Sequence, residues 1–118
     1  MGADEAVRQY YDAWQNKDGD FSEVPLAEDF EFTGPVASFD TAEAYRAMAR
    51  EAGRAVTSFV VRRQFVHGDS VCSIIDWEMA IPGVGKLRAA EVLEVAGGQI
   101  VRGELFYDGE ALRRAMGA

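Results

Sequence analysis

The chain changes its hydrophobic period once, close to Gly53, and this change limits the folds that it can adopt. Before Gly53, apolar residues recur at intervals of three and four, which is the pattern of an amphipathic helix. After Gly53, apolar and polar residues alternate through four long runs, which is the pattern of strands. Helices grouped ahead of an antiparallel sheet predict an α+β fold with the helices on one face of the sheet.

Three helices are predicted in the first half of the chain. The first covers residues 4–17, which carry a continuous apolar stripe. The second is short and covers residues 22–29, because Ser22 can cap a helix that has Pro25 in its first turn. A brief strand, FEF, and a turn, GPVAS, follow. The third helix begins at the capping-box sequence DTAE and ends near Ala52.

The second half predicts a meander of four strands, with the sequences TSFVVRRQFVH, DSVCSIIDWEMAI, KLRAAEVLEV and QIVRGELFYD. Gly68-Asp69, PGVG and Gly97-Gly98 separate these runs and suit hairpin turns. The tail GEALRRAM predicts a final short helical turn. With 118 residues and 48% hydrophobic content, we expect a single domain over residues 1–118.

Charge and leader patterns exclude several classes of partner. The net charge is -8, and no stretch gathers Lys and Arg into a stripe that could neutralise phosphates, so we expect no nucleic acid partner. The start MGADEAVRQYYDAW has neither a basic region nor an apolar region of a signal peptide. The single Cys72 cannot form an internal disulfide. We therefore expect a cytoplasmic protein with no membrane association.

Metal and cofactor motifs are also missing from the sequence. His67 is the only histidine and has no Cys, Asp or Glu around it at ligand spacing, so we expect no metal. The glycine pairs belong to hairpins, and neither a phosphate loop nor a dinucleotide fingerprint occurs. We expect no cofactor.

Glu91 is the residue that most needs an explanation. In a strand, it shares one face with Leu87, Ala89, Leu93 and Val95. A carboxylate on such an apolar face must be paired, protonated or placed beside a cavity, because an isolated buried charge is too costly.

Arg63 offers one solution for Glu91. It shares an otherwise apolar strand face with Phe59, Val61 and Phe65, so it is the corresponding misfit of opposite charge. We predict that Glu91 and Arg63 lie within salt-bridge reach or flank one cavity. A purely structural pair and a role facing a ligand both stay open.

A second set of residues predicts an apolar pocket. Its members come from separate elements, and each falls on the apolar face of its own element; they are Trp14, Met48, Phe59, Trp77, Met79, Leu93, Leu105 and Tyr107. A few polar groups among aromatic side chains are typical of a site for a small ligand. We expect a small, mostly apolar, oxygen-bearing molecule as the partner.

Three stretches, VRQYYDAWQNKD, LAEDFEFTGPVAS and GGQIVRGELFYD, occur in an order and spacing that resembles a known superfamily. The chain resembles the SnoaL-like and ketosteroid-isomerase-like branch of the nuclear-transport-factor-2-like superfamily over nearly its whole length. The resemblance implies a cone-shaped, strongly curved antiparallel sheet with three N-terminal helices packed on its concave face. Such proteins include isomerases, polyketide cyclases, epoxide hydrolases, dehydratases and proteins without catalysis.

The resemblance also implies roles for single residues. Tyr10 and Glu91 stand where ketosteroid isomerases hold the substrate oxygen with a tyrosine and a protonated acid. The general base of those enzymes falls at Gly34, which has no side chain, so steroid isomerisation is not expected. Tyr10 also lies on the apolar stripe of its helix, where a purely structural role is open.

Three functions remain open from the sequence. The first is a cofactor-independent isomerase, cyclase or dehydratase in which Glu91 acts as acid and Tyr10 or Tyr107 donates a hydrogen bond. The second is a non-catalytic module that binds a small ligand or dimerises. The third, implied by the resemblance, is an epoxide hydrolase-like enzyme that uses Arg63 and Glu91.

A homodimer is expected in each case. The predicted outer face of the sheet is more apolar than solvent exposure requires, since it carries Val60, Val66, Ile74, Ala90, Val92 and Phe106. Helices can cover only one side of the sheet, and the resembling proteins commonly pair their sheets back to back. We predict a two-fold contact through this outer face.

Overall fold

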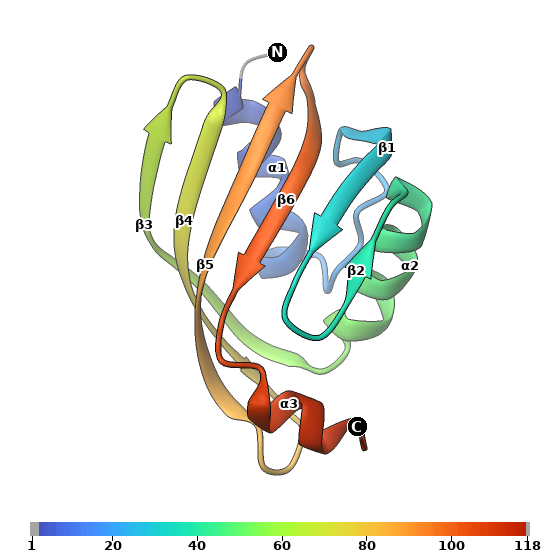
Figure 1. Ribbon diagram of the computed structural model, residues 1–118, viewed down its shortest axis with the longest axis vertical. Coiled ribbons are helices and arrows are strands. Elements are labelled where there is room, and N and C mark those ends of the chain that lie inside the picture. The colour runs from blue at the N-terminus through green and yellow to red at the C-terminus, as the bar shows by residue number, and fades with distance from the viewer. Residues whose placement is uncertain (1–2, 118) are drawn as a thin grey trace.

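The computed structural model describes residues 3–117, which form three helices and six strands (Figure 1). In chain order they are α1 (Ala3–Asn16), β1 (Leu26–Thr33), β2 (Ser38–Phe39), α2 (Ala42–Gly53), β3 (Val56–His67), β4 (Ser70–Met79), β5 (Gly85–Ala96), β6 (Gln99–Phe106) and α3 (Glu110–Ala115). The change from helical to strand period near Gly53 therefore marks the end of α2 and the start of the long meander.

All six strands form one curved sheet in the order β2-β1-β6-β5-β4-β3. Neighbouring strands are antiparallel, except that β1 runs parallel to β6, so the sheet is mixed. Helix α1 packs across β3 to β6, and α2 packs against β1 and β2 on the concave side (Figure 1). The predicted α+β fold with a curved sheet is confirmed.

The predicted helix over residues 22–29 is wrong. The Asp20 carboxylate caps a turn by accepting a hydrogen bond from the Ser22 backbone N–H, and the chain then enters β1 at Leu26. Pro25 has no N–H to donate, but its carbonyl accepts from the backbone N–H of Ile100. Pairing with β6 thus outweighs the local capping signal, and the three helices are two N-terminal ones and the C-terminal α3.

Helix α2 begins one residue later than the capping-box sequence indicates. The side chain of Thr41 accepts a hydrogen bond from the Ala44 backbone N–H, and therefore Thr41 is the N-cap residue. At the other end of α2, the Asp18 carbonyl packs against Gly53 and fills the space where a Cβ atom at position 53 would lie. This close approach fixes α2 against the turn that follows α1.

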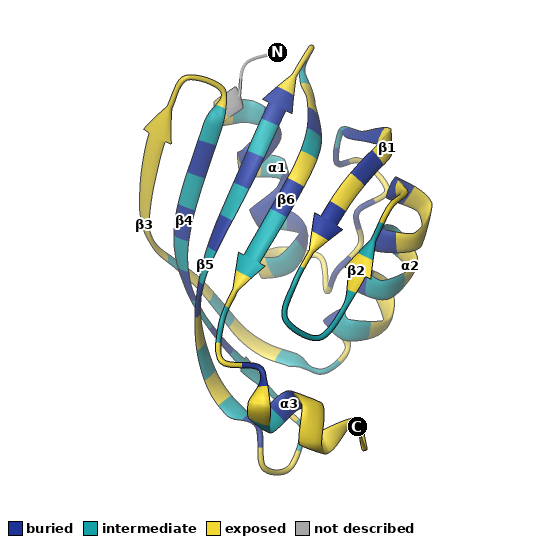
Figure 2. Ribbon diagram, in the orientation of Figure 1, coloured by how far each residue is buried: buried dark blue, intermediate teal, exposed yellow. Residues whose placement is uncertain are grey.

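Strand β4 shows which face of the sheet is covered. Val71, Ser73, Ile75 and Trp77 are buried beneath the helices, and the residues between them are half-buried on the convex face. Figure 2 shows the same alternation along β4 and β5, whereas most of β3 is exposed. The concave face therefore holds the core and the candidate site.

Strand β3 changes faces part-way along its length. Phe59 pairs with Trp77 on the concave face, but the register shifts by one residue between Val61 and Arg63. After this β-bulge, Arg63 pairs with Ile74 on the convex face. The predicted alternation that placed Arg63 beside Val61 on one apolar face is wrong, because the extra residue reverses every later side chain.

Candidate functional site

Glu91 lies in the middle of β5 on the concave face, and 3% of it is exposed. It accepts two hydrogen bonds from α1: the Tyr10 hydroxyl donates to Oε2 at 2.9 Å, and the Tyr11 hydroxyl donates to Oε1 at 2.9 Å. Both tyrosines reach the same carboxylate because α1 packs against β5 as it crosses the sheet. Each oxygen of the buried carboxylate therefore accepts one hydrogen bond from a neutral donor.

A third tyrosine extends this network. The hydroxyl of Tyr45, on α2, forms a short hydrogen bond with the hydroxyl of Tyr10. Since Tyr10 uses its single proton to donate to Glu91, the Tyr45 hydroxyl is the donor in this second bond. Hydrogen bonds thus run from Tyr45 through Tyr10 to one oxygen of Glu91, and from Tyr11 to the other.

Burial dominates the electrostatics of this network. It raises the pKa of Glu91 from 4.5 to about 7, although the hydrogen bonds from Tyr11 and Tyr10 act in the opposite direction. Burial, followed by the charge of Glu91, also raises the pKa values of Tyr10, Tyr11 and Tyr45, so these hydroxyls stay protonated. Near neutral pH, Glu91 exists both as an acid and as a carboxylate.

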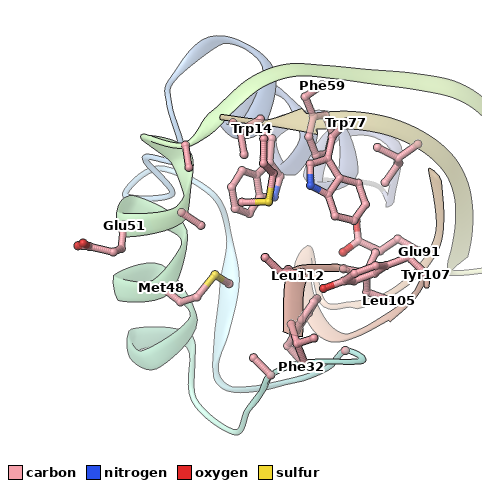
Figure 3. Close-up of a pocket in the computed structure, with 18 of the residues that line it drawn as sticks. Trp14, Phe32, Met48, Glu51, Phe59, Trp77, Glu91, Leu105, Tyr107 and Leu112 are labelled. Carbon is pink, nitrogen blue, oxygen red and sulfur yellow. The ribbon is translucent and has the colours of Figure 1, made fainter. Parts of the chain in front are cut away.

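An apolar cavity of about 470 Å³ opens beside Glu91 (Figure 3). The structure places these predicted ligand-binding residues in its lining: Trp14, Met48, Phe59, Trp77, Met79, Leu105 and Tyr107. Leu93 is the exception, because it is completely buried in the core next to Gly103. Among the described lining residues, Glu91 is the only acidic one whose side chain lies inside the cavity, since Glu51 points away from it at the rim (Figure 3).

Other lining residues were not predicted from the sequence. They are mainly Phe32 and Phe39 from the first two strands, and Leu112 and Met116 from the C-terminal segment. Phe32 stands in the stretch FEF, for which the sequence predicted a brief strand, and Leu112 stands in the tail GEALRRAM, for which it predicted a helical turn. Their apolar alternation was visible, but nothing local indicated that β1 and α3 close the same cavity.

The predicted contact between Glu91 and Arg63 is wrong. Arg63 is exposed on the convex face beyond the bulge, where its guanidinium lies 5.1 Å from the centre of the Phe65 ring. Tyrosine hydroxyls, rather than an opposite charge, stabilise the buried carboxylate. Arg63 therefore has no place in the candidate site.

The two tyrosines that the sequence offered as donors lie at different depths. Tyr10 is completely buried behind Glu91 and does not border the cavity, so it acts on the cavity only through that carboxyl group. Tyr107 borders the cavity, packs edge-on against Trp77 at 5.0 Å, and has its pKa raised by burial. Gly34 also borders the cavity and brings no side chain to it.

Within residues 3–117, no group of three or more His, Cys, Asp or Glu side chains could hold a metal ion. In the same range, no helix is long and apolar enough to cross a membrane.

This arrangement, a curved mixed sheet with helices over its concave face, is the nuclear-transport-factor-2-like fold, as similar solved structures show. The chain belongs to the SnoaL-like domain family, whose profile matches residues 7–103. The resemblance read from the sequence is thereby confirmed. A comparison with curated proteins gives no match.

Solved structures with similar folds come from several bacteria. An NTF2-like protein of unknown function from Cytophaga hutchinsonii is 21% identical, with a TM-score of 0.82 and 96% of each chain covered. A protein with a ketosteroid isomerase-like fold from Catenulispora acidiphila, in complex with trimethylamine, is 15% identical, with a TM-score of 0.75 and coverage of 96% of this chain and 92% of that chain. An LEH-like epoxide hydrolase from M. tuberculosis is 20% identical, with a TM-score of 0.72 and coverage of 96% and 87%. At these identities, the likeness shows the fold alone.

Proposed function

We propose that this chain binds a small, mostly apolar, oxygen-bearing molecule, steroid-like or polyketide-like, and that Glu91 acts on its oxygen as an acid. The observation that carries the proposal is a carboxyl group with a pKa of about 7 at the wall of an aromatic cavity. A volume of about 470 Å³ is in the range of small-molecule sites.

The protonated form of Glu91 suits this role. A neutral carboxyl group has one O–H to donate, and its oxygens still have lone pairs for the hydroxyls of Tyr10 and Tyr11. The two tyrosines can therefore keep the carboxyl group in place while its O–H turns to a carbonyl or hydroxyl oxygen in the cavity. Transfer of this proton to the oxygen is the step that an isomerase, cyclase or dehydratase requires.

Removal of a proton from carbon is not part of the proposal, since Gly34 supplies no base. An epoxide hydrolase-like reaction through Arg63 and Glu91 is not proposed either, because Arg63 lies on the convex face. A module that binds the ligand without turnover stays the alternative. Mass spectrometry separates the two: a product that forms only with Glu91 present supports catalysis, and a bound ligand recovered unchanged supports the module.

A second ligand class is favoured by the charge of the same site. The aromatic side chains of Trp14, Phe59 and Trp77 line the cavity together with a carboxylate, and no Lys, Arg or His occurs among the described lining residues. Aromatic faces attract organic cations, and an ionised Glu91 would be the counter-ion. The similar structure from Catenulispora acidiphila holds trimethylamine. A small organic amine is therefore the second candidate.

Affinity as a function of pH distinguishes the two ligand classes. We would titrate the chain with 1-tetralone, a neutral bicyclic ketone, and with 1-aminotetralin, its amine counterpart, while following the fluorescence of Trp14 and Trp77. The ketone needs protonated Glu91, so its affinity should fall by about tenfold per pH unit well above the pKa of Glu91. The ammonium ion needs ionised Glu91, so its affinity should fall by about tenfold per pH unit well below that pKa.

Two variants control this experiment. Glu91→Gln removes the titrating group, so both pH dependences should disappear. Glu51→Gln removes the carboxylate at the rim and should leave both unchanged. If neither compound binds saturably at any pH, the ligand-binding proposal is wrong.

A further inference from the structure

A second pocket, of about 430 Å³, lies on the other side of the hydrogen bond between Tyr11 and Glu91. Its lining is mainly polar between α1, β3 and β4, with the polar side chains Asp4, Arg8, Tyr11, Gln15 and Gln64. Asp4, Arg8 and Gln64 are exposed, so bulk water reaches this polar pocket.

The two cavities share no lining residue. Glu91 borders the apolar cavity but not the polar pocket, whereas Tyr11 borders the polar pocket but not the apolar cavity. The Tyr11 hydroxyl donates to Oε1 of Glu91 at 2.9 Å, and this single hydrogen bond joins the two spaces. Tyr11 therefore both borders the polar pocket and donates a hydrogen bond to the buried acid.

The other hydrogen bonds of Glu91 lead elsewhere. The branch through Tyr10 ends at Tyr45, which borders the apolar cavity. A ligand that fills this cavity would exclude water from that end of the branch. The branch through Tyr11, by contrast, leads to a residue that borders the polar pocket, which lies outside the ligand's cavity.

Ser73 links the polar pocket to the strand next to Glu91. It is completely buried, lies opposite Glu91 in the β4–β5 ladder, and accepts a hydrogen bond from the exposed Gln64 at 3.1 Å. Gln64 borders the polar pocket, so polar contacts extend from that pocket to the level of Glu91 in the sheet.

We propose that the polar pocket is the proton port of Glu91, and that Tyr11 passes protons between water in that pocket and the carboxyl group in the apolar cavity. In this relay, the Tyr11 hydroxyl gives its proton to Oε1 of ionised Glu91 while its oxygen takes a proton from a hydronium ion in the polar pocket. Two O–H bonds break and two form, so the net result is one proton delivered to Glu91, and Tyr11 is neutral before and after. The inference rests on the proposed function, because Glu91 needs a route for protons only if it protonates a bound ligand and must then regain its proton.

Tyr10 provides a matched control for Tyr11. Each tyrosine donates one hydrogen bond of 2.9 Å to Glu91, but only Tyr11 borders the polar pocket. Both Tyr10→Phe and Tyr11→Phe should raise the pKa of Glu91, because each removes a donor to the ionised form. Only Tyr11→Phe should slow the exchange of the proton.

The experiment measures the proton exchange rate of Glu91 by carboxyl ¹³C relaxation dispersion, which detects exchange in the microsecond to millisecond range. The resonance is assigned by its loss in Glu91→Gln, and each protein is measured at the pH of its own Glu91 midpoint. We expect Tyr11→Phe to exchange at least about tenfold more slowly than the wild type and Tyr10→Phe. Equal rates in the two variants would overturn the proposal.

A second measurement uses the unaltered chain, so it does not depend on the folding of Tyr11→Phe. With the apolar cavity saturated by tetralin, a hydrocarbon of the same ring size that accepts no hydrogen bond from Glu91, the exchange rate of Glu91 at its midpoint should stay within about twofold. A fall of about tenfold would show that protons enter through the apolar cavity and would overturn the proposal. Failure of both tetralin and 1-tetralone to bind would contradict the proposed function, while the comparison of the two variants would still decide the proton route.

Discussion

At the scale of single residues, Glu91 shows two opposing effects on one carboxyl group. Two hydroxyl donors favour its ionised form, and burial disfavours that form more strongly, so the pKa rises to about 7. A salt bridge with an arginine would have lowered the pKa and left a permanent anion. Neutral tyrosine donors keep the carboxyl group in place and still allow it to be an acid near neutral pH.

The raised pKa predicts how stability depends on pH. Because the folded state binds the Glu91 proton more tightly than the unfolded state, Glu91 contributes its full stability below pH 4.5 and loses it as pH rises through about 7. The free energy of unfolding of the wild type, relative to Glu91→Gln, should fall by roughly 3 kcal/mol over this range. Urea denaturation of both proteins from pH 4 to pH 9 would measure it.

The comparison with Glu91→Gln removes the contributions of all other titrating groups, which the two proteins share. A difference in unfolding free energy that stays constant with pH would contradict a raised pKa. A difference that increases with pH would mean that the folded protein stabilises the ionised form, and Glu91 would then be no acid at neutral pH.

At the scale of elements, the sequence predicts what depends on local pattern. The periods of the apolar residues place α1, α2 and the four long strands, and they correctly put Glu91 on the covered face of β5. Two predictions were wrong, the helix over residues 22–29 and the placement of Arg63 on an apolar strand face. Both features depend on how strands pair, which a local pattern does not show. One extra residue in β3 cannot be seen in its own alternation, since it appears only against the register of β4.

The position of Arg63 predicts a small effect of its removal. Breaking a buried ion pair costs several kcal/mol, but an exposed arginine against an aromatic ring contributes only about 1 kcal/mol or less. Arg63→Ala should therefore change the free energy of unfolding by no more than about 1 kcal/mol and leave the pKa of Glu91 unchanged. Denaturation and a carboxyl ¹³C titration would measure the two quantities.

Arg62→Ala is the neighbouring control, because Arg62 pairs with Asp76 on the same convex face at 2.8 Å and is also exposed. It should likewise leave Glu91 unaffected. A shift of the Glu91 pKa in Arg63→Ala alone would mean that Arg63 does reach the carboxylate, contrary to the register of β3.

At the scale of the whole molecule, none of the helices in residues 3–117 covers the convex face of the sheet. Its apolar residues form a convex patch, which consists of Val60, Phe65, Ile74, Ala90, Val92 and Phe106. Phe65 is 51% exposed and Phe106 is 55% exposed. Val66 was predicted to belong to this face, but beyond the bulge it pairs with Val71 and borders the polar pocket.

Ion pairs border the convex patch. Asp76 accepts hydrogen bonds from Arg62 and Arg88, and these hold the pKa of its carboxyl group well below the usual range. An apolar centre with a rim of charged side chains is the composition of a protein–protein interface. Because the sheet curves, two copies can pack convex face on convex face and leave both apolar cavities accessible.

We therefore predict a homodimer through the convex patch. Light scattering at micromolar concentration and ordinary salt should give twice the mass of the chain, and Val92→Arg should shift the mass towards the monomer by placing a charge at the centre of the contact. Ala44→Arg adds the same charge on the exposed side of α2, so it should remain dimeric. A monomeric wild type would contradict the dimer. Equal dissociation of the two variants would place the contact elsewhere, because only a contact on the convex face makes an arginine at position 92 more disruptive to the dimer than one at position 44.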